Sequence, residues 1–127
     1  MSSLNYVAPV FVVSDLPRSL AYYQDKLGFG VSFNYDGFYA GVVRDGCQVH
    51  LKHGAPAEQP AAQPNSAEHI HICFGVSDAQ ALASQFATAG VRFSVPLREQ
   101  PYGKEFYVKD PDGYVLAFVQ ASSASNT

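Results

Sequence analysis

Cysteine, basic runs and long apolar runs are scarce in this chain of 127 residues. Its two cysteines, Cys47 and Cys73, are too few for a disulfide framework, so both are expected to be free thiols in strands. Charged residues make up 15 %, and the net charge of −3 is scattered along the sequence. Because no basic run could follow a phosphate backbone, a nucleic-acid partner is not expected.

Membrane and export signals are also missing. No stretch approaches the roughly 20 apolar residues that a membrane span needs. The N-terminal residues lack the basic segment and small-residue cleavage site of a signal peptide. The length suits one compact domain, and together these features predict a soluble cytoplasmic protein without a membrane partner.

Motifs of nucleophilic catalysis are absent too, since the sequence has no phosphate-binding glycine loop and no nucleophile elbow. Aromatic residues, in contrast, are abundant: 13 % of the chain, with eight Tyr, nine Phe and no Trp. Most of these rings must belong to the core, and the functional question is whether some of them line a cleft.

The sequence repeats itself. The string Val13–Asp15 recurs as Val76–Asp78, each copy follows an apolar extended run, and each precedes a helical stretch that ends at a glycine, Gly28 or Gly90. An aspartate before each helix can cap its first turn. The first helix carries an apolar stripe made of Leu16, Leu20, Tyr23 and Leu27.

Strand patterns broken by Asp-Gly turn signals surround both helices. The first half predicts strands at Val7–Val13, Val31–Tyr35, Phe38–Arg44 and Cys47–Lys52. The second half predicts strands at Ile70–Val76, Arg92–Val95, Lys104–Lys109 and Tyr114–Val119. The prediction is an α+β fold of two βαβββ modules.

The expected boundaries follow from composition. A single domain spans residues 1–120, with module one at 5–53, a Pro-, Ala- and Gln-rich linker at 54–67, and module two at 68–120. Residues 121–127 are small and polar and are predicted to be a disordered tail. Two such sheets, within one chain or across a dimer, would bury their open faces against each other and leave a cleft.

The repeated unit, with DLPRSLAYYQDKLGF after the first strand and KDPDGYVLAFV near the end, resembles the vicinal-oxygen-chelate superfamily. That group includes glyoxalase I, extradiol dioxygenases, fosfomycin-resistance enzymes and bleomycin-resistance proteins. The resemblance runs from about Val7 to Gln120. The stretches FYAGVVRDG and EQPYGKEFYVKDPDG resemble the bleomycin-resistance branch more than the catalytic branches.

The resemblance also bears on metal binding, because active members hold a divalent metal with side chains from four strands. At the matching positions this chain has Ala8, His50, His71 and Ala117. Two imidazoles make a weak, open site, so no tight metal site and no cofactor are expected. The alternative is a divalent metal held through His50 and His71, with Glu105 or a partner residue as third ligand.

The histidines have other interpretations. His50 and His71 could supply hydrogen bonds at the floor of a cleft, or they could be ordinary strand histidines bonded to neighbouring backbone. His69, His71 and Cys73 alternate along one predicted strand and so share a face, which in principle could hold zinc. Adjacent ligands on a straight strand rarely converge on one ion, which disfavours that alternative.

Aromatic residues provide the candidate ligand contacts. The resemblance places Tyr39 and Tyr102 where the bleomycin-binding branch carries rings that line the cleft, and flat ligands stack on such rings. The alternative is that alternate rings on each strand are core. The predicted ligand-binding residues are Phe33, Phe38, Tyr39, His50, His71, Tyr102 and Phe106.

The predicted function is metal-independent binding and sequestration of an aromatic or cationic drug-like molecule by a symmetric homodimer, similar to bleomycin-resistance proteins and implying antibiotic resistance. Carboxylates near the expected cleft agree weakly with a cationic ligand. The alternative is a metal-dependent lyase, isomerase or dioxygenase of the same superfamily.

Overall fold

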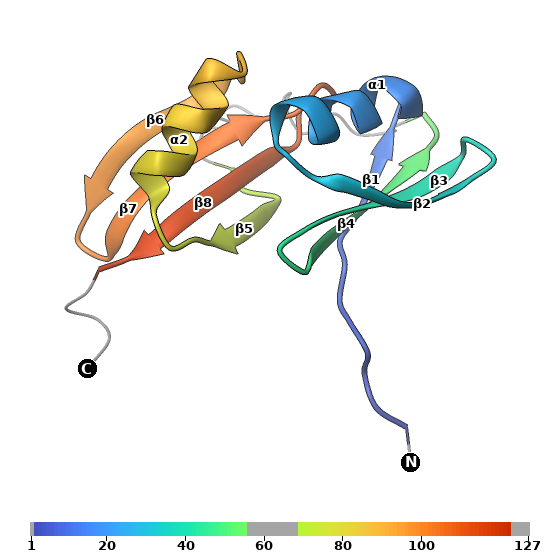
Figure 1. Cartoon of the computed structure of the whole chain (residues 1–127), viewed down its shortest axis with the longest axis horizontal. Coiled ribbons are helices and arrows are strands. Elements are labelled where there is room, and N and C mark those ends of the chain that lie inside the picture. The colour runs from blue at the N-terminus through green and yellow to red at the C-terminus, as the bar shows by residue number, and fades with distance from the viewer. Residues whose placement is uncertain (1, 56–68, 123–127) are drawn as a thin grey trace. The chain divides into compact units, whose positions relative to one another are not determined.

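A computed structural model of the chain describes residues 2–55 and 69–122, so most of the predicted linker and residues 123–127 of the predicted tail lie outside the described residues. The chain divides into two compact units, residues 1–57 and 58–127, each of which contains one copy of the repeat (Figure 1). Each unit has one four-stranded sheet and one helical segment. The predicted α+β fold of two βαβββ modules is confirmed.

The first unit begins with strand β1 (Val10–Val13), followed by helix α1 (Leu16–Ala21), which continues into a π-helical turn, η1 (Tyr22–Lys26). Strands β2 (Gly30–Tyr35), β3 (Tyr39–Arg44) and β4 (Cys47–His53) complete it. The sheet order is β1-β4-β3-β2, with β1 parallel to β4 and the other pairs antiparallel. The first strand is therefore shorter at its N-terminal end than the sequence predicts.

The second unit repeats this arrangement with strand β5 (Ile72–Gly75), helix α2 (Ala79–Thr88), and strands β6 (Phe93–Gln100), β7 (Gly103–Lys109) and β8 (Val115–Ala121). The sheet order is β5-β8-β7-β6. Ala121 pairs with Gly103, so the last strand includes a residue that was predicted to belong to the tail. No helix in the described residues has the length and apolar character to cross a bilayer.

The two helices begin in the same way. The Asp15 carboxylate accepts a 3.0 Å bond from the Arg18 N–H, and the Asp78 carboxylate accepts a 3.0 Å bond from the Ala81 N–H. Both bonds satisfy N–H groups that have no partner inside the helix. The capping role predicted for both aspartates is confirmed.

The Asp-Gly dipeptides of the first unit form tight hairpin turns. Asp36 and Gly37 have φ values of 51° and 75°, and Asp45 and Gly46 have 51° and 80°. Positive φ at both central residues is the type I′ turn, whose twist matches the flanking strands. These turns fix the pairing of β2 with β3 and of β3 with β4.

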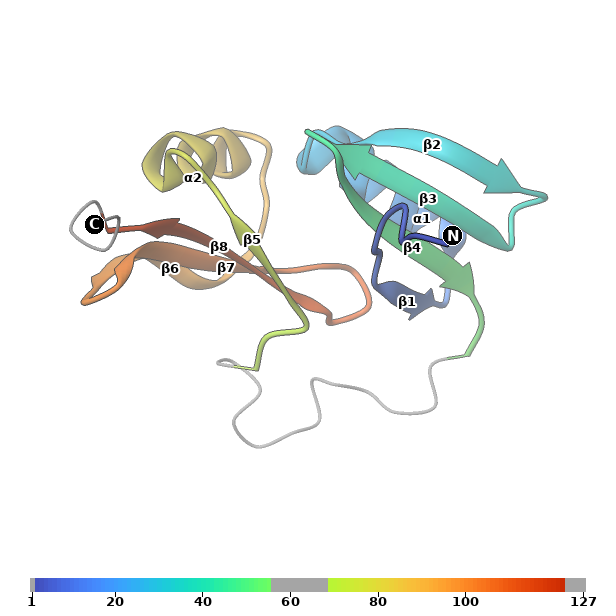
Figure 2. The ribbon, with the colours of Figure 1, turned by 90° about the horizontal axis from the view of Figure 1, so that it is seen from below.

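Each helix covers one face of its own sheet (Figure 2). In the second unit the Phe86 ring on α2 contacts Phe106 at 5.8 Å and Phe118 at 5.3 Å, both edge to face. In the first unit Tyr23 and Leu27 are fully buried, together with Val42 and Leu51 of the sheet. Because side chains alternate along a strand, every other residue points to the sheet face that carries no helix.

Candidate functional site

The open face of the first sheet carries a group of aromatic rings. In the strand register His50 of β4 lies opposite Gly41 of β3, and Gly41 lies opposite Phe33 of β2. Tyr39 shares this face because it precedes Gly41 by two residues. We call Phe33, Tyr39 and His50 the aromatic face.

These three rings contact one another directly. Phe33 and Tyr39 are stacked, with centroids 5.9 Å apart and planes 14° apart. Phe33 meets His50 edge to face at 5.1 Å, and the Tyr39 hydroxyl lies 3.0 Å from His50 Nδ1. Tyr35 extends the group, since its ring is 5.3 Å from Phe33 and 63 % of the residue is exposed.

Gly41 makes this packing possible. A Cβ built on Gly41 would lie 2.8 Å from Phe33 Cδ2 and 2.9 Å from Cζ, closer than real atoms approach. The Phe33 ring therefore lies on bare backbone, which is a characteristic use of glycine in a strand. Without that space the ring would have to leave its position between Tyr39 and His50.

His50 provides an unsatisfied polar atom on this face. The residue is only 7 % exposed, and within the described residues its Nε2 is buried without a hydrogen-bond partner. Its Nδ1 already forms a hydrogen bond with the Tyr39 hydroxyl. The hydroxyl donates to Nδ1 in one tautomer of the imidazole, and the Nδ1–H donates to the hydroxyl in the other. A buried polar group without a partner costs free energy, and a ligand atom that pairs with Nε2 would recover it.

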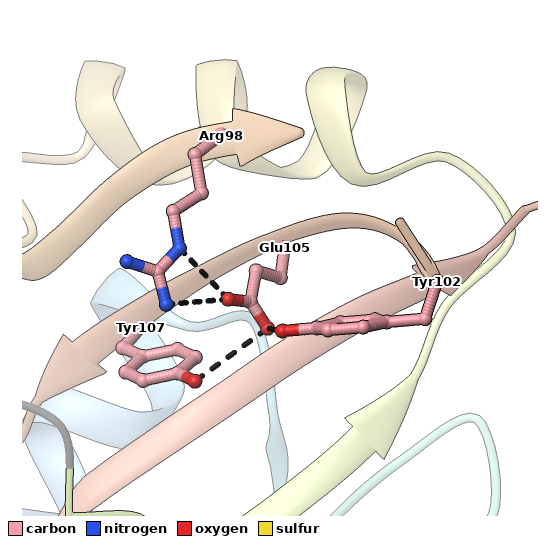
Figure 3. Close-up of polar contacts among 4 residues, drawn as sticks. All are labelled: Arg98, Tyr102, Glu105 and Tyr107. Carbon is pink, nitrogen blue, oxygen red and sulfur yellow. Dashed lines mark hydrogen bonds and ion pairs between the residues drawn. The ribbon is translucent and has the colours of Figure 1, made fainter. Parts of the chain in front are cut away.

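The open face of the second sheet carries a polar cluster that the sequence analysis did not predict (Figure 3). Glu105 is only 2 % exposed. Its Oε2 accepts a 2.8 Å hydrogen bond from Arg98 Nε and forms an ion pair with Arg98 Nη2 at 2.6 Å. Its Oε1 accepts from the Tyr102 hydroxyl at 2.6 Å and from the Tyr107 hydroxyl at 3.5 Å. We call these four residues the Glu105 cluster.

Strand pairing explains how the Glu105 cluster forms. Residues 101 and 102 make the turn between β6 and β7, so Gln100 pairs with Gly103 and Arg98 pairs with Glu105. Bulges in β6 shift the register on both sides of Val95. A signal existed in the sequence: a two-residue turn at Pro101-Tyr102 brings residues 98 and 105 opposite each other.

Tyr102 is held at this turn by its backbone and by its hydroxyl. Its carbonyl accepts a 2.8 Å bond from the Ser122 N–H, and 50 % of the residue remains exposed. The hydrogen bond to the Glu105 carboxylate raises the pKa of Tyr102 to about 12. Tyr102 is thus a neutral donor with a fixed position, which agrees with its predicted place outside the core.

His71 of the second unit is bonded to the backbone. Its ring Nδ1 accepts a 2.9 Å bond from the Val115 N–H, and its backbone N–H donates to the Val115 carbonyl at 2.9 Å. Burial, followed by the nearby His69, lowers the pKa of His71 below its usual value. A neutral ring is the state that can accept this bond at Nδ1.

The remaining predicted contacts differ in outcome. Phe106 was predicted to bind ligand, but its ring is fully buried and stacks on Phe118 at 5.1 Å on the helix-covered face. That prediction is wrong, because the alternation of β7 places Phe106 in the core and Glu105 on the open face. Phe38 lies beside the hairpin turn and is 53 % exposed. Both cysteines are free thiols in strands, as predicted, and burial raises the pKa of the Cys73 thiol.

The donor groups of the described residues do not fit a divalent metal. They include no group of three or more His, Cys, Asp or Glu side chains placed to hold an ion, so the face of His69, His71 and Cys73 makes no such group either. The repeat explains this. When Asp15 is aligned with Asp78, Ala8 is aligned with His71. The strand pairing then makes His50 of the first unit equivalent to Ala117 of the second. Each unit therefore has one imidazole and one methyl group at its two equivalent positions.

The fold, a paired βαβββ repeat with one helix on each sheet, defines a class of two-module α+β proteins. Within that class, the family model described as Glyoxalase/Bleomycin resistance protein/Dioxygenase superfamily matches residues 3–118. The chain belongs to this superfamily.

Solved structures support the assignment. The chain is similar to the bleomycin-binding protein of bleomycin-producing Streptomyces verticillus complexed with copper(II)-bleomycin, at 27 % identity and TM-score 0.72, over 96 % of this chain and 100 % of that one. It also shares its fold with a glyoxalase/bleomycin resistance protein/dioxygenase from Alicyclobacillus acidocaldarius, at 16 % identity and TM-score 0.78, over 95 % and 94 % of the two chains.

A curated relative matches over a shorter stretch. A lactoylglutathione lyase of Pseudomonas aeruginosa is 44 % identical over 52 residues, which are 41 % of this chain and 29 % of that enzyme. The match therefore spans less than a third of the enzyme's length.

Proposed function

We propose that this protein binds a planar, aromatic small molecule without a metal ion and holds it without changing it chemically. The observation that carries the proposal is the aromatic face, where two stacked rings border a buried imidazole nitrogen that has no partner within the described residues. Stacked rings attract flat ligands, and a single unsatisfied polar atom fixes their orientation.

The chemistry of the donor groups supports binding over catalysis. Ala8 and Ala117 supply no ligand atoms at two of the four positions that the superfamily resemblance assigns to metal. Glu105 is engaged on both oxygens by Arg98, Tyr102 and Tyr107, which counts against a role as a third metal ligand. The two faces therefore offer stacking and hydrogen bonding to a ligand.

Similarity to the bleomycin-binding protein supports a small-molecule partner and a sequestering role in antibiotic resistance. We propose further that the chain acts in the cytoplasm as a symmetric homodimer. Sedimentation velocity of the purified protein tests the dimer directly, and a monomer at all concentrations would contradict it.

The test is a titration with metal-free bleomycin, followed by tyrosine fluorescence, in the presence of a chelator. We expect saturable binding with unchanged bleomycin by mass spectrometry. Phe33→Leu should weaken binding about 2- to 10-fold, the range of an aromatic contact. Phe93→Leu is the matched control, because this ring packs against Phe106 and is not part of the aromatic face.

His50→Phe keeps a ring at position 50 and removes both the Nε2 atom and the Nδ1 contact with the Tyr39 hydroxyl. It should also weaken binding about 2- to 10-fold, the loss expected for one hydrogen bond. Binding that appears only after a divalent metal is added, or a bleomycin molecule of altered mass, would overturn the proposal.

A metal-dependent lyase is the second candidate, favoured by the match to lactoylglutathione lyase over 52 residues. Its test is lactoylglutathione turnover by protein purified without chelator and supplied with divalent metals in turn. We expect no turnover and no stoichiometric metal in the purified protein. Turnover that is abolished in both His50→Ala and His71→Ala would replace the first proposal with the second.

A further inference from the structure

Tyr102 combines exposure with a fixed position in its hairpin turn. Half of the residue is exposed, yet its hydroxyl donates to Glu105 and its carbonyl accepts from Ser122. Gly103 next to it has a φ of 146°, and a Cβ there would collide with the Gln120 backbone, so the turn lies tightly against β8. The ring is therefore anchored at both ends before any ligand arrives.

We infer that Glu105 is a positioning residue that presents the Tyr102 ring as a fixed platform for cationic planar ligands, in preference to neutral ones. This inference rests on the proposed ligand-binding function and adds a specificity to it. Tyr102 is the group that contacts the ligand, and Glu105 acts through Tyr102.

The charge distribution explains the preference. A phenol that donates to a carboxylate moves toward phenolate character, which increases the electron density of its ring and its attraction for a cation. Arg98 neutralises part of the Glu105 charge from the opposite oxygen, Oε2. The carboxylate nevertheless dominates at the phenol, since the pKa of Tyr102 is raised and not lowered.

The cluster already contains one contact of this kind. The Arg98 guanidinium carbon lies 5.5 Å from the centroid of the Tyr107 ring, within the usual range of a cation–π contact. Tyr107 is buried beneath this cation, with 4 % exposure, whereas Tyr102 is half exposed. Of the two tyrosines that donate to Glu105, only Tyr102 presents its ring to solvent.

Positioning adds to the preference by lowering the cost of binding. A free exposed side chain loses rotamer freedom when a ligand stacks on it, and that loss reduces affinity. The bond to Glu105 already restricts the Tyr102 side chain in the folded protein, so little rotamer freedom remains to be lost when a ligand binds. Removing the hydroxyl alone should therefore weaken binding even though the ring remains.

The experiment compares two probes of nearly equal shape, N-methylacridinium and neutral acridine, at mildly alkaline pH, with affinities from fluorescence titration. We expect the wild-type protein to bind the cation about threefold more tightly than the neutral probe, as for an exposed cation–π contact. Tyr102→Phe, which leaves the Glu105–Arg98 ion pair intact and lies in an exposed turn, should lower this ratio, because the Phe ring keeps an ordinary cation–π attraction but loses the bond to Glu105.

Glu105→Gln retains an acceptor for Tyr102 but removes the charge, and it should also lower the ratio while leaving acridine affinity within about twofold. Glu99→Gln is the matched control, because Glu99 is an exposed residue on the same hairpin, opposite Lys104 in the strand register. If Glu99→Gln lowers the ratio as much as Glu105→Gln, general charge and not positioning explains the preference, and the inference is wrong.

The outcomes separate this inference from the proposed function. Equal affinity of the wild-type protein for both probes, or a ratio that Tyr102→Phe leaves unchanged, overturns the inference while ligand binding stands. Absence of binding to either probe and to bleomycin overturns both. If Glu105→Gln does not fold, the Tyr102→Phe result decides alone.

Discussion

The substitution Gly41→Ala tests the link between backbone and aromatic face. The backbone of Gly41 is outside the left-handed region, so alanine is compatible with its conformation. The added methyl group would meet the Phe33 ring at less than 3 Å and displace it from Tyr39 and His50. We therefore expect damage to the ligand-binding face and not to the fold.

The magnitude follows from two opposing effects. Loss of the two ring contacts of Phe33 costs about 1–3 kcal/mol, while replacing glycine by alanine inside a strand returns about 0.5–1 kcal/mol. The net loss in the free energy of unfolding is about 1 kcal/mol, measured by urea denaturation. Ligand affinity should fall by about tenfold, since an aromatic contact of roughly 1.4 kcal/mol is lost.

Gly75→Ala is the matched control. Gly75 also lies inside a strand, and among the described residues a Cβ built there meets no heavy atom within 4 Å. It should leave affinity unchanged and raise stability slightly, by up to about 1 kcal/mol. The reasoning is refuted if Gly41→Ala binds planar ligand as well as the wild-type protein does, or if Gly75→Ala weakens binding equally.

Three further predictions concern the core and the titrating groups. Phe106→Ala should lower the free energy of unfolding by about 3–5 kcal/mol, because the ring is fully buried; a cost below 1 kcal/mol would contradict its place in the core. In absorbance titrations one tyrosine should ionise near pH 12, and this step should vanish in Tyr102→Phe. Since the folded state holds that proton more tightly, stability should fall as pH rises from about 10 toward 12. His71 has a lowered pKa in the folded state, so its contribution is present above about pH 6.5 and is lost as pH falls through the folded value. Its ring protons in nuclear magnetic resonance should titrate below that pH, and a midpoint above it would contradict the bond from Val115.

Much of the fold could be predicted because the signals are local. The two aspartate caps, the glycine at each helix end and the Asp-Gly turns each act within a few residues, and each appears in the structure as expected. The placement of Phe33 and Tyr39 on one face followed less directly, since it needs the register beside the turn, in which Tyr35 pairs with Tyr39 and Phe33 with Gly41.

The Glu105 cluster was harder to predict. Side chains alternate along a strand, but the sequence alone did not show which alternate residues of this strand face the core. The sequence analysis assigned Phe106 to the ligand and Glu105 only to a metal alternative. A shift of one residue along the strand exchanges the sheet faces on which these two side chains lie. The predicted sixth strand also stopped at Val95, which left Arg98 outside any strand. The pairing of Arg98 with Glu105 needs the bulged continuation of β6, a tertiary feature.

The π-helical turn η1 resolves a small mismatch between the two halves of the chain. After the aligned cap residues Asp15 and Asp78, the first helical segment is one residue longer: Phe29 donates to the Tyr23 carbonyl, whereas Val91 donates to the Phe86 carbonyl. In a regular α-helix an additional residue rotates everything that follows by about 100°. The widened turn contains that residue, so Tyr23 and Phe29 both stay buried. A duplicated module can thus change length inside a helix without disturbing the strands on either side.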